Sequence, residues 1–409
     1  MSTPRWSLWR TIVAFGVVSL LADMVYEAMR ATSGPFLAQL GASALVVGLV
    51  TGAGEAVALG LRLVTGPAAD RSGMHWRFTV VGYAMTAVSV PLLAFAPFVG
   101  AAGVGLASVL ILLERTGKAV RSPSKSALLA RMTTPVGRGR GFGVHKAPDQ
   151  IGAFAGPLLV AGIAAWTGHL WVAFVVLAVP GAGALVLLGV LRRRAPLAVG
   201  VAPAPAGTED LPEDHPEDDA GDRPTPPREP LPRAFGVFSA ACALVTLGLM
   251  TFGVISFAWV ADGTLTAAWV PVVYAGAMAV EAVAALGTGW AYDRVGSRVL
   301  LALPVLVAAV PALAFAHELA LVLVGTALWA LATGIQDSTV KALVADLVPA
   351  GRLGSAYGTF AAAMGVAALA GGTLAGALHA DHLGLLVAVV AAAQVLALGL
   401  LVVTLRRIK

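Results

Sequence analysis

Apolar segments of about 20 residues recur along the whole chain, separated by short polar connections. An α-helix of this length spans the roughly 30 Å hydrocarbon core of a bilayer. Glycine and proline are tolerated inside such segments because neighbouring helices satisfy the backbone groups that they free. The pattern predicts twelve membrane-spanning helices, over residues 11–31, 43–65, 77–97, 100–121, 139–166, 169–191, 234–260, 267–290, 298–316, 319–345, 353–378 and 383–405.

Residues 195–232 break this pattern. The segment holds ten prolines and nine acidic residues, and it cannot bury enough apolar surface to offset the entropy lost on ordering. We therefore expect a disordered cytoplasmic linker here, with a regulatory tail as the alternative. The predicted fold is an all-α membrane protein of two pseudo-symmetric six-helix bundles, over residues 1–194 and 233–409.

The composition supports a membrane protein and excludes other classes. Of 409 residues, 58% are hydrophobic and 12% are charged, whereas soluble domains carry about 25% charged residues. The single cysteine, Cys242, excludes a disulfide or a cysteine metal cluster within this chain. No histidine, acid and nucleophile set is clustered in the sequence, so we expect no enzyme. The basic residues lie at membrane edges, so we expect the lipid bilayer as a partner and no nucleic acid.

Lysine and arginine are distributed unevenly between the connections. The termini and the even-numbered connections are basic, whereas the odd-numbered connections contain neither residue. Because basic residues are enriched in cytoplasmic loops, we expect both termini in the cytoplasm and the protein in the plasma (inner) membrane. The first apolar run lacks a small-residue cleavage site, so we interpret it as a retained helix rather than a signal peptide.

Two matching octets indicate that the halves are related. The pattern Gly-x-x-x-Asp-Arg-x-Gly follows the second predicted span, at Gly66, Asp70, Arg71 and Gly73. The same pattern follows the eighth span, at Gly289, Asp293, Arg294 and Gly296. Repeated halves of six spans are typical of secondary transporters whose binding site lies at the membrane midplane.

These octets resemble the signature of the major facilitator superfamily, and the resemblance covers the chain apart from the linker. It implies a secondary transporter that exposes its site alternately to the two sides of the membrane. It also implies that Asp70 and Arg71 lie in a loop and lock the cytoplasmic gate between the halves, with Asp293 and Arg294 as a weaker second copy. The two glycines of the first octet are then expected to allow close backbone approach.

The fifth predicted span resembles that of drug/proton antiporters of the superfamily. Their pattern Gly-x(8)-Gly-x(3)-Gly-Pro is matched here by Gly143, Gly152, Gly156 and Pro157. The antiporter pattern continues with two glycines, where this chain has valine and alanine. Glycines at this spacing are also typical of tightly packed membrane helices, which is the alternative interpretation.

Three charges fall close together in the first span. Asp23, Glu27 and Arg30 are spaced so that they share one helix face. A charge at the bilayer centre costs about 2.5–3.5 kcal/mol, so we expect this face to be turned toward the protein interior. Arg30 can pair with Glu27, whereas Asp23 has no basic partner on its own helix. A desolvated carboxyl group can bind and release a proton near neutral pH, so Asp23 and Glu27 are the predicted proton-coupling sites.

Further charges within the spans are candidates for coupling or substrate binding. Glu55 lies about as deep in the second span as Asp23 does in the first, and Glu281 is the only acid deep in the seventh to ninth spans. The antiporter resemblance implies that Arg115 corresponds to an arginine linked to proton transfer. Arg62 lies closer to the cytoplasm, and we expect it to be structural.

Other residues are expected to form salt bridges or to line the substrate site. The predicted gating or structural salt bridges pair Glu114 with Lys118, Lys146 with Asp149, and Asp337 with Lys341. Aromatic and methionine side chains suit adaptable apolar recognition, and the candidates of these types are Met24, Tyr26, Phe36, Phe252, Phe257, Trp259, Tyr274 and Trp329.

The sequence therefore predicts proton-coupled export of a small amphipathic molecule by a monomer that uses the proton gradient and no cofactor. One alternative is a divalent transition-metal exporter with Asp23, Glu27 and Glu55 as oxygen ligands, because residues 114–159 also resemble some nickel-efflux proteins. A proton-coupled uptake symporter is a second alternative. Outside the transporter class, the alternatives are a membrane sensor without transport and a membrane-embedded enzyme.

Overall fold

The computed structural model describes residues 6–195, 231–349 and 352–407, and no β-strand occurs within these ranges. The predicted linker lies almost entirely outside them. The α-helices are α1 (Leu8–Gln39), α2 (Ala44–Gly60), α3 (Arg62–Ser72), α4 (His75–Leu92), α5 (Gly103–Thr133), α6 (Arg138–Thr167), α7 (Leu170–Val176), α8 (Ala178–Arg194), α9 (Arg233–Leu249), α10 (Phe252–Ala261), α11 (Val270–Val295), α12 (Ala302–Ala314), α13 (Leu319–Ile335), α14 (Lys341–Leu347), α15 (Leu353–Leu378) and α16 (Leu383–Arg407).

Eleven helical segments among the described residues are long and apolar enough to cross a membrane, where the sequence predicts twelve spans. The difference arises in Val270–Ala314, a segment of 45 residues that covers the predicted spans 267–290 and 298–316. As one continuous helix it would be roughly 65 Å long, about twice the thickness of the hydrocarbon core. It is not continuous, because α11 ends at Val295 and Gly296 has a φ of 65° before a 3₁₀ turn leads into α12.

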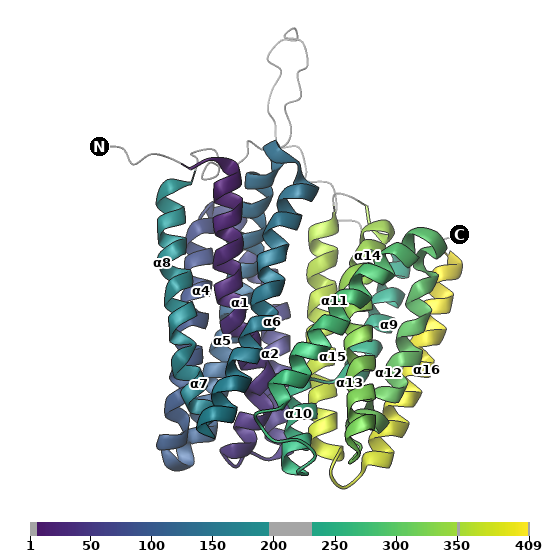
Figure 1. The fold of residues 1–409 in the computed structure, drawn as a ribbon. Coiled ribbons are helices and arrows are strands. Elements are labelled where there is room, and N and C mark those ends of the chain that lie inside the picture. Colours follow the sequence, from purple (N-terminus) through teal and green to yellow (C-terminus); the bar gives the residue numbers. More distant parts are fainter. Residues whose placement is uncertain (1–5, 196–230, 350–351, 408–409) are drawn as a thin grey trace.

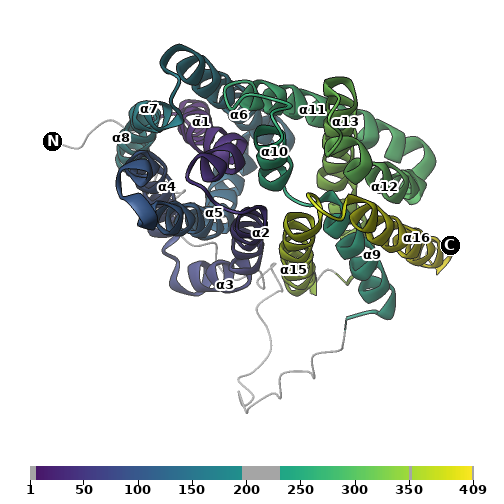
Figure 2. The same cartoon turned by 90° about the horizontal axis from the view of Figure 1, so that it is seen from below.

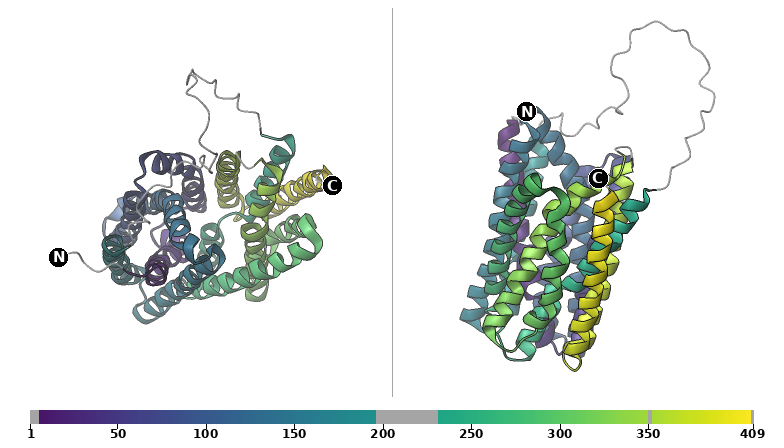
Figure 3. Two further views of the ribbon diagram at one scale, coloured as in Figure 1. Left: turned by 90° about the horizontal axis from the view of Figure 1, so that it is seen from above. Right: turned by 90° about the vertical axis from the view of Figure 1, so that its right-hand side faces the viewer.

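The helices of residues 8–194 lie side by side on the left of Figure 1, and those of residues 233–407 lie on the right. Helix α1 begins, α8 ends, α9 begins and α16 ends at the upper end of the molecule, which we call the terminal face. The views along the helices in Figures 2 and 3 show the same two groups, with α10 and α11 of the second group beside α1 and α6 of the first. The ends of both halves therefore share one face.

The two groups of helices touch most closely toward the end opposite the terminal face. A Cβ atom at Gly48 of α2 would lie 2.1 Å from the carbonyl oxygen of Gly372 in α15. One at Gly34, near the end of α1, would lie 2.0 Å from the carbonyl oxygen of Gly253 in α10. Only glycine permits such backbone contact, so α1 and α2 pack tightly against α10 and α15 at this end.

Within the first group, α1 and α6 also approach each other through glycine. A Cβ atom at Gly152 would lie 2.2 Å from the carbonyl oxygen of Leu20, and one at Gly156 would lie 2.2 Å from that of Met24. Gly143, the first glycine of the antiporter-like pattern, has open space at its Cβ position instead. The pattern therefore contributes two packing glycines rather than three, because Gly143 faces away from α1 while its neighbour His145 contacts Phe15 and Ser19 of α1.

The predicted span 234–260 is interrupted rather than continuous. Helix α9 ends at Leu249, Met250 has a φ of 58°, and the Thr251 side chain accepts a hydrogen bond from the first turn of α10. The freed carbonyl oxygen of Leu249 accepts a 3.1 Å hydrogen bond from Trp329 Nε1, and the Thr51 and Thr251 hydroxyl groups are 2.7 Å apart. These contacts satisfy polar groups that a broken helix would otherwise expose in the membrane.

The close contact between α1 and α6 can be tested with a matched pair of glycine substitutions. We expect Gly152→Ala to destabilise the protein by about 1–3 kcal/mol, because its Cβ would overlap the backbone of α1. Gly143→Ala should be neutral or slightly stabilising, because the site is open and alanine favours the helix. The thermal unfolding midpoints of the two purified variants in detergent measure this, and equal midpoints would contradict the contact.

Candidate functional site

A cavity of about 1090 Å³ lies between the two groups of helices. It is large enough for a small-molecule ligand, since such sites measure about 300–1,000 Å³. Charged residues in its wall include Arg30, Glu55, Arg62, Asp70, Lys118, Glu281, Asp337 and Arg352, and its apolar residues include Leu249, Met250, Trp329, Phe360 and Met364. We call it the central cavity. Its wall extends to Asp70 in the last turn of α3, so the cavity reaches toward the terminal face.

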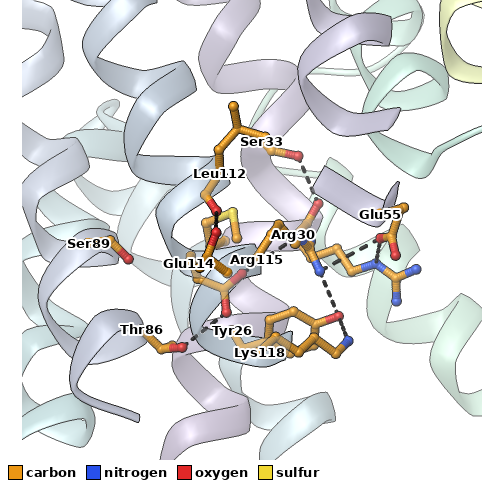
Figure 4. Close-up of polar contacts among 12 residues, drawn as sticks. Tyr26, Arg30, Ser33, Glu55, Thr86, Ser89, Leu112, Glu114, Arg115 and Lys118 are labelled. Carbon is orange, nitrogen blue, oxygen red and sulfur yellow. Dashed lines mark hydrogen bonds and ion pairs between the residues drawn. The ribbon is translucent and has the colours of Figure 1, made fainter. Parts of the chain in front are cut away.

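Glu55 lies between two guanidinium groups in the wall of the central cavity (Figure 4). Its Oε1 atom is 3.6 Å from Arg30 Nε of α1 and 3.7 Å from Arg115 NH1 of α5. In the sequence Glu55 has only small apolar neighbours, because both partners come from other helices. The carboxylate is therefore compensated within the protein and holds α1, α2 and α5 together.

The Glu27 carboxylate also has partners within the protein, one in each half. The Tyr274 hydroxyl of α11 donates a 2.5 Å hydrogen bond to Glu27 Oε2, and Arg30 NH1 donates a 3.3 Å hydrogen bond to the Tyr274 oxygen. The predicted contact between Arg30 and Glu27 is present at 3.9 Å. The Arg30 guanidinium group thus contacts the carboxylates of both Glu27 and Glu55.

The predicted pair of Glu114 and Lys118 is wrong. The fully buried Glu114 carboxylate lies 3.6 Å from Arg115 Nε and 3.8 Å from Arg121 NH1, and Thr86 Oγ1 donates a 3.1 Å hydrogen bond to it. Lys118 instead donates to the Tyr26 hydroxyl, and its Nζ atom lies 3.9 Å from the centre of the Tyr26 ring. The side chain turns away from its own helix because Tyr26 of α1 offers both an oxygen acceptor and an aromatic face.

Asp23 does have a partner, but that partner is a second carboxyl group. Asp23 of α1 and Asp149 of α6 lie side by side, close enough for their carboxyl groups to interact. Lys125 Nζ lies 3.2 Å from Asp149 Oδ1, and Lys146 Nζ contacts the other carboxylate oxygen, as its i, i+3 spacing predicts. One turn away, Ser19 Oγ of α1 lies 3.3 Å from His145 Nε2 of α6.

Two adjacent carboxylates repel each other, and a proton on one of them removes this repulsion. Lys125 and Lys146 both contact Asp149, whereas Asp23 has no ion pair with the described residues. The pair lines a cavity of about 370 Å³, which we call the side cavity. Both cavities are lined by Arg30, Lys118, Glu281 and Asp337, so the carboxyl pair lies next to the central cavity.

Arg62 and Glu281 face the central cavity, and neither side chain has a hydrogen bond or an ion pair with the described residues. Arg62 Nε and Glu281 Oε2 are both inaccessible to solvent. The structural role of Arg62 stays a prediction. Asp337 lines both cavities, but its predicted pairing with Lys341 is untested because the Lys341 side chain lies outside the described structure.

The two octets end helices rather than form loops. Asp70 and Arg71 lie in the last turn of α3, and Gly73 follows with a φ of 64°. The expected close backbone approach is absent, since the Gly66 Cβ position is an ordinary 3.7 Å from Pro123 and that of Gly73 is open. Helix α3 continues through Gly66 and Pro67 and ends only at Ser72. Asp293 and Arg294 likewise lie in the last turn of α11.

The alternative metal site does not form. No group of three or more histidine, cysteine, aspartate or glutamate side chains that could hold a metal ion occurs in residues 6–195, 231–349 and 352–407. Glu27 and Glu55 instead contact Arg30, and Asp23 contacts Asp149. Carboxylates that already compensate guanidinium groups are poor ligands for a cation.

Most of the uncharged lining candidates are core residues. Trp329 lines the central cavity and Tyr26 lines the side cavity, whereas Phe36 packs edge-on against Phe174, and Phe252 against Tyr274. Sequence reasoning missed Met250, Phe360 and Met364 of the central cavity. Their apolar surroundings in the sequence resemble those of core residues, so only the helix packing distinguishes them.

Comparisons with known proteins agree with this architecture. The family model of the Major Facilitator Superfamily matches residues 15–280 and 240–409. An uncharacterized protein of Mycobacterium tuberculosis is 48% identical over 397 residues, which cover 97% of this chain and 93% of that protein. Multidrug resistance protein MdtH of Yersinia pestis is 33% identical over 136 residues, about a third of each chain (33% and 32%). A crystal structure of the peptide transporter POT superposes with a TM-score of 0.76 at 16% identity, and covers 100% of this chain and 98% of that one.

The buried network around Glu114 gives a stability prediction. Glu114→Gln should destabilise the protein by about 3–5 kcal/mol, because it leaves Arg121 without a carboxylate and Arg115 with Glu55 alone. Glu318→Gln is the matched control, since Glu318 is exposed and its side chain does not cap α13. Chemical unfolding of the purified variants measures the difference. A Glu114→Gln variant as stable as the control would show that the network contributes no net stability.

Proposed function

We propose that this chain, which belongs to the Major Facilitator Superfamily, is a proton-coupled exporter of small amphipathic molecules. The observation that supports this best is the Asp23–Asp149 carboxyl pair, which needs a proton and lies beside a cavity of ligand size. We further propose that the protein acts as a monomer without a cofactor or catalytic activity, in the plasma (inner) membrane, with the proton gradient as its energy source.

The proposed transport cycle is alternating access by the two halves. Twelve membrane crossings result if Val270–Ala314 is counted as two, and the basic connections favour a cytoplasmic terminal face. On this assignment the structure corresponds to an inward-open state, because the central cavity reaches toward the terminal face while glycine contacts close the opposite end. Transport then requires the contacts of Gly34 and Gly48 to separate.

Proton coupling rests on the residues shared by the two cavities. Loss of the proton would leave Asp23 and Asp149 as adjacent carboxylates, which repel each other and attract nearby cations. Lys118 lies in the walls of both cavities, so its position responds to the charge of the pair as well as to a ligand. A proton and a substrate that favour different arrangements of the same side chain are thermodynamically coupled.

The other predicted coupling residues receive a different role in this proposal. Glu27 and Glu55 are engaged by Arg30, and Arg115 contacts Glu55. We assign these four residues to holding the wall of the central cavity and Asp23 to carrying the proton. Export rather than uptake is favoured by the similarity to a multidrug resistance protein and by the methionine and aromatic wall, which suits varied apolar ligands.

The coupling assignment predicts the behaviour of a single variant in proteoliposomes. Small amphipathic compounds added to wild-type vesicles loaded with a pH-sensitive dye should drive proton movement, whose sign separates antiport from symport. Asp23→Asn should reduce this movement to the level of protein-free vesicles, because asparagine cannot exchange a proton.

Asp262→Asn is the matched control, because Asp262 is exposed at the end of α10, and it should behave as the wild type. Compound-driven proton movement that survives in Asp23→Asn would show that the proton is carried elsewhere.

A further inference from the structure

Arg62 and Glu281 are half-buried charged side chains in the wall of the central cavity, and neither makes a hydrogen bond or ion pair with the described residues. Arg62 lies at the start of α3 in the first half, and Glu281 lies in α11 in the second. Arg352, just before α15, also has an inaccessible NH1 atom without a partner in this wall. Other charges nearby have partners: Arg30 contacts Glu55, Arg115 contacts Glu114, and Lys118 contacts Tyr26.

An uncompensated charge in a membrane protein is expensive, and such residues usually mark a pathway or a ligand site. If Arg62 and Glu281 only filled space, apolar residues of similar volume would make the protein without a ligand more stable. The two groups also do not neutralise each other, even though they share one cavity. We conclude that something that enters the cavity must compensate both.

The remaining wall of the cavity is apolar. Leu249, Met250, Trp329, Phe360 and Met364 surround the space between the two halves. The indole N–H of Trp329 already donates to the Leu249 carbonyl oxygen, so this side chain offers its ring face rather than a hydrogen bond. A ligand that fits this wall has an apolar body, and methionine side chains adapt to bodies of different shape.

We infer that the substrate is a small zwitterion with an apolar body, whose anionic group binds Arg62 and whose cationic group binds Glu281. This inference rests on the proposed function in taking the central cavity as the transport site. A guanidinium group favours a carboxylate or phosphate, which accepts two of its N–H groups, and a carboxylate favours an ammonium group. A ligand with one charge leaves one of the two residues buried and unpaired, which gives selectivity against it.

Binding of a zwitterion would also connect the halves. One charged group contacts α3 of the first half and the other contacts α11 of the second. The ligand would therefore be held fully only when both helices line the same closed space. A substrate that binds one arrangement of the halves better than the other shifts the population toward that arrangement.

The test uses ligands that differ only in charge. Phenylalanine and the dipeptide phenylalanylglycine are each used in four forms: zwitterionic, N-acetylated (anionic), C-amidated (cationic) and blocked at both ends (neutral). Binding to the purified full chain in detergent, without any pH gradient, is measured by thermal stabilisation. For at least one of the two lengths, we expect the zwitterion to bind about tenfold or more tightly than the other forms, the size of one lost charge-assisted hydrogen bond.

Two variants assign the charges to residues. Arg62→Gln should weaken binding of the zwitterion and the anion and leave that of the cation unchanged, whereas Glu281→Gln should weaken binding of the zwitterion and the cation and leave that of the anion unchanged. Arg192→Gln and Glu318→Gln are matched controls at exposed sites away from the cavity. If a variant does not fold, the four forms measured on the wild type decide alone.

The inference is overturned if the neutral or singly charged forms bind as tightly as the zwitterion, if no form binds, or if both folded variants keep the wild-type charge preference. The proposed proton coupling is tested by a separate measurement. Asp23→Asn should bind the zwitterion as the wild type does in this assay, whereas its defect appears only as lost proton movement in vesicles.

Discussion

The contact between two carboxyl groups, Asp23 of α1 and Asp149 of α6, is the interaction on which the proposed function depends. We propose that a shared proton relieves the repulsion between them. The contact also requires the two helices to approach closely, and Gly152 and Gly156 permit this because their hydrogen atoms face the α1 backbone where any side chain would collide. The antiporter-like glycine pattern and the proton site are therefore parts of one contact.

Around that contact, charged side chains have partners on their own helix and on other helices. Arg30 contacts Glu27 of α1 and Glu55 of α2, while Arg115 and Arg121 contact Glu114 within α5. Thr86 of α4 also donates to Glu114, so these contacts join α1, α2, α4 and α5 around the central cavity. Arg62 and Glu281 make no such contact, and we propose that a ligand compensates them.

Much of the fold can be predicted from the sequence because the bilayer imposes a single requirement, a helix of apolar residues about 20 residues long. The span predicted over 353–378 coincides with α15 (Leu353–Leu378), and that over 139–166 differs from α6 by one residue at each end. The break at Met250 escaped prediction, because the flanking Gly248 and Gly253 do not differ from the glycines inside unbroken spans, and the contacts with Thr51 and Trp329 come from distant segments.

The candidate site is less predictable from sequence, for a related reason. Spacing along one helix identifies pairs such as Lys146 and Asp149, but it cannot show which of several partners within reach a side chain contacts. Glu114 lies within reach of Lys118, yet its carboxylate contacts two arginines of the same helix, while Lys118 contacts Tyr26 of α1. Likewise, Asp23 has no cation nearby in the sequence, and its carboxyl partner lies 126 residues away on α6.

Infrared difference spectroscopy tests the shared proton most directly, because a protonated carboxyl group has a C=O stretch that a carboxylate lacks. In D₂O near neutral pH, we expect the purified wild type to show this band and Asp23→Asn to lose it. Glu27→Gln should keep it, since Glu27 contacts Arg30 and Tyr274 and not the carboxyl pair. A band of unchanged intensity in Asp23→Asn, or one lost in Glu27→Gln instead, would contradict the account.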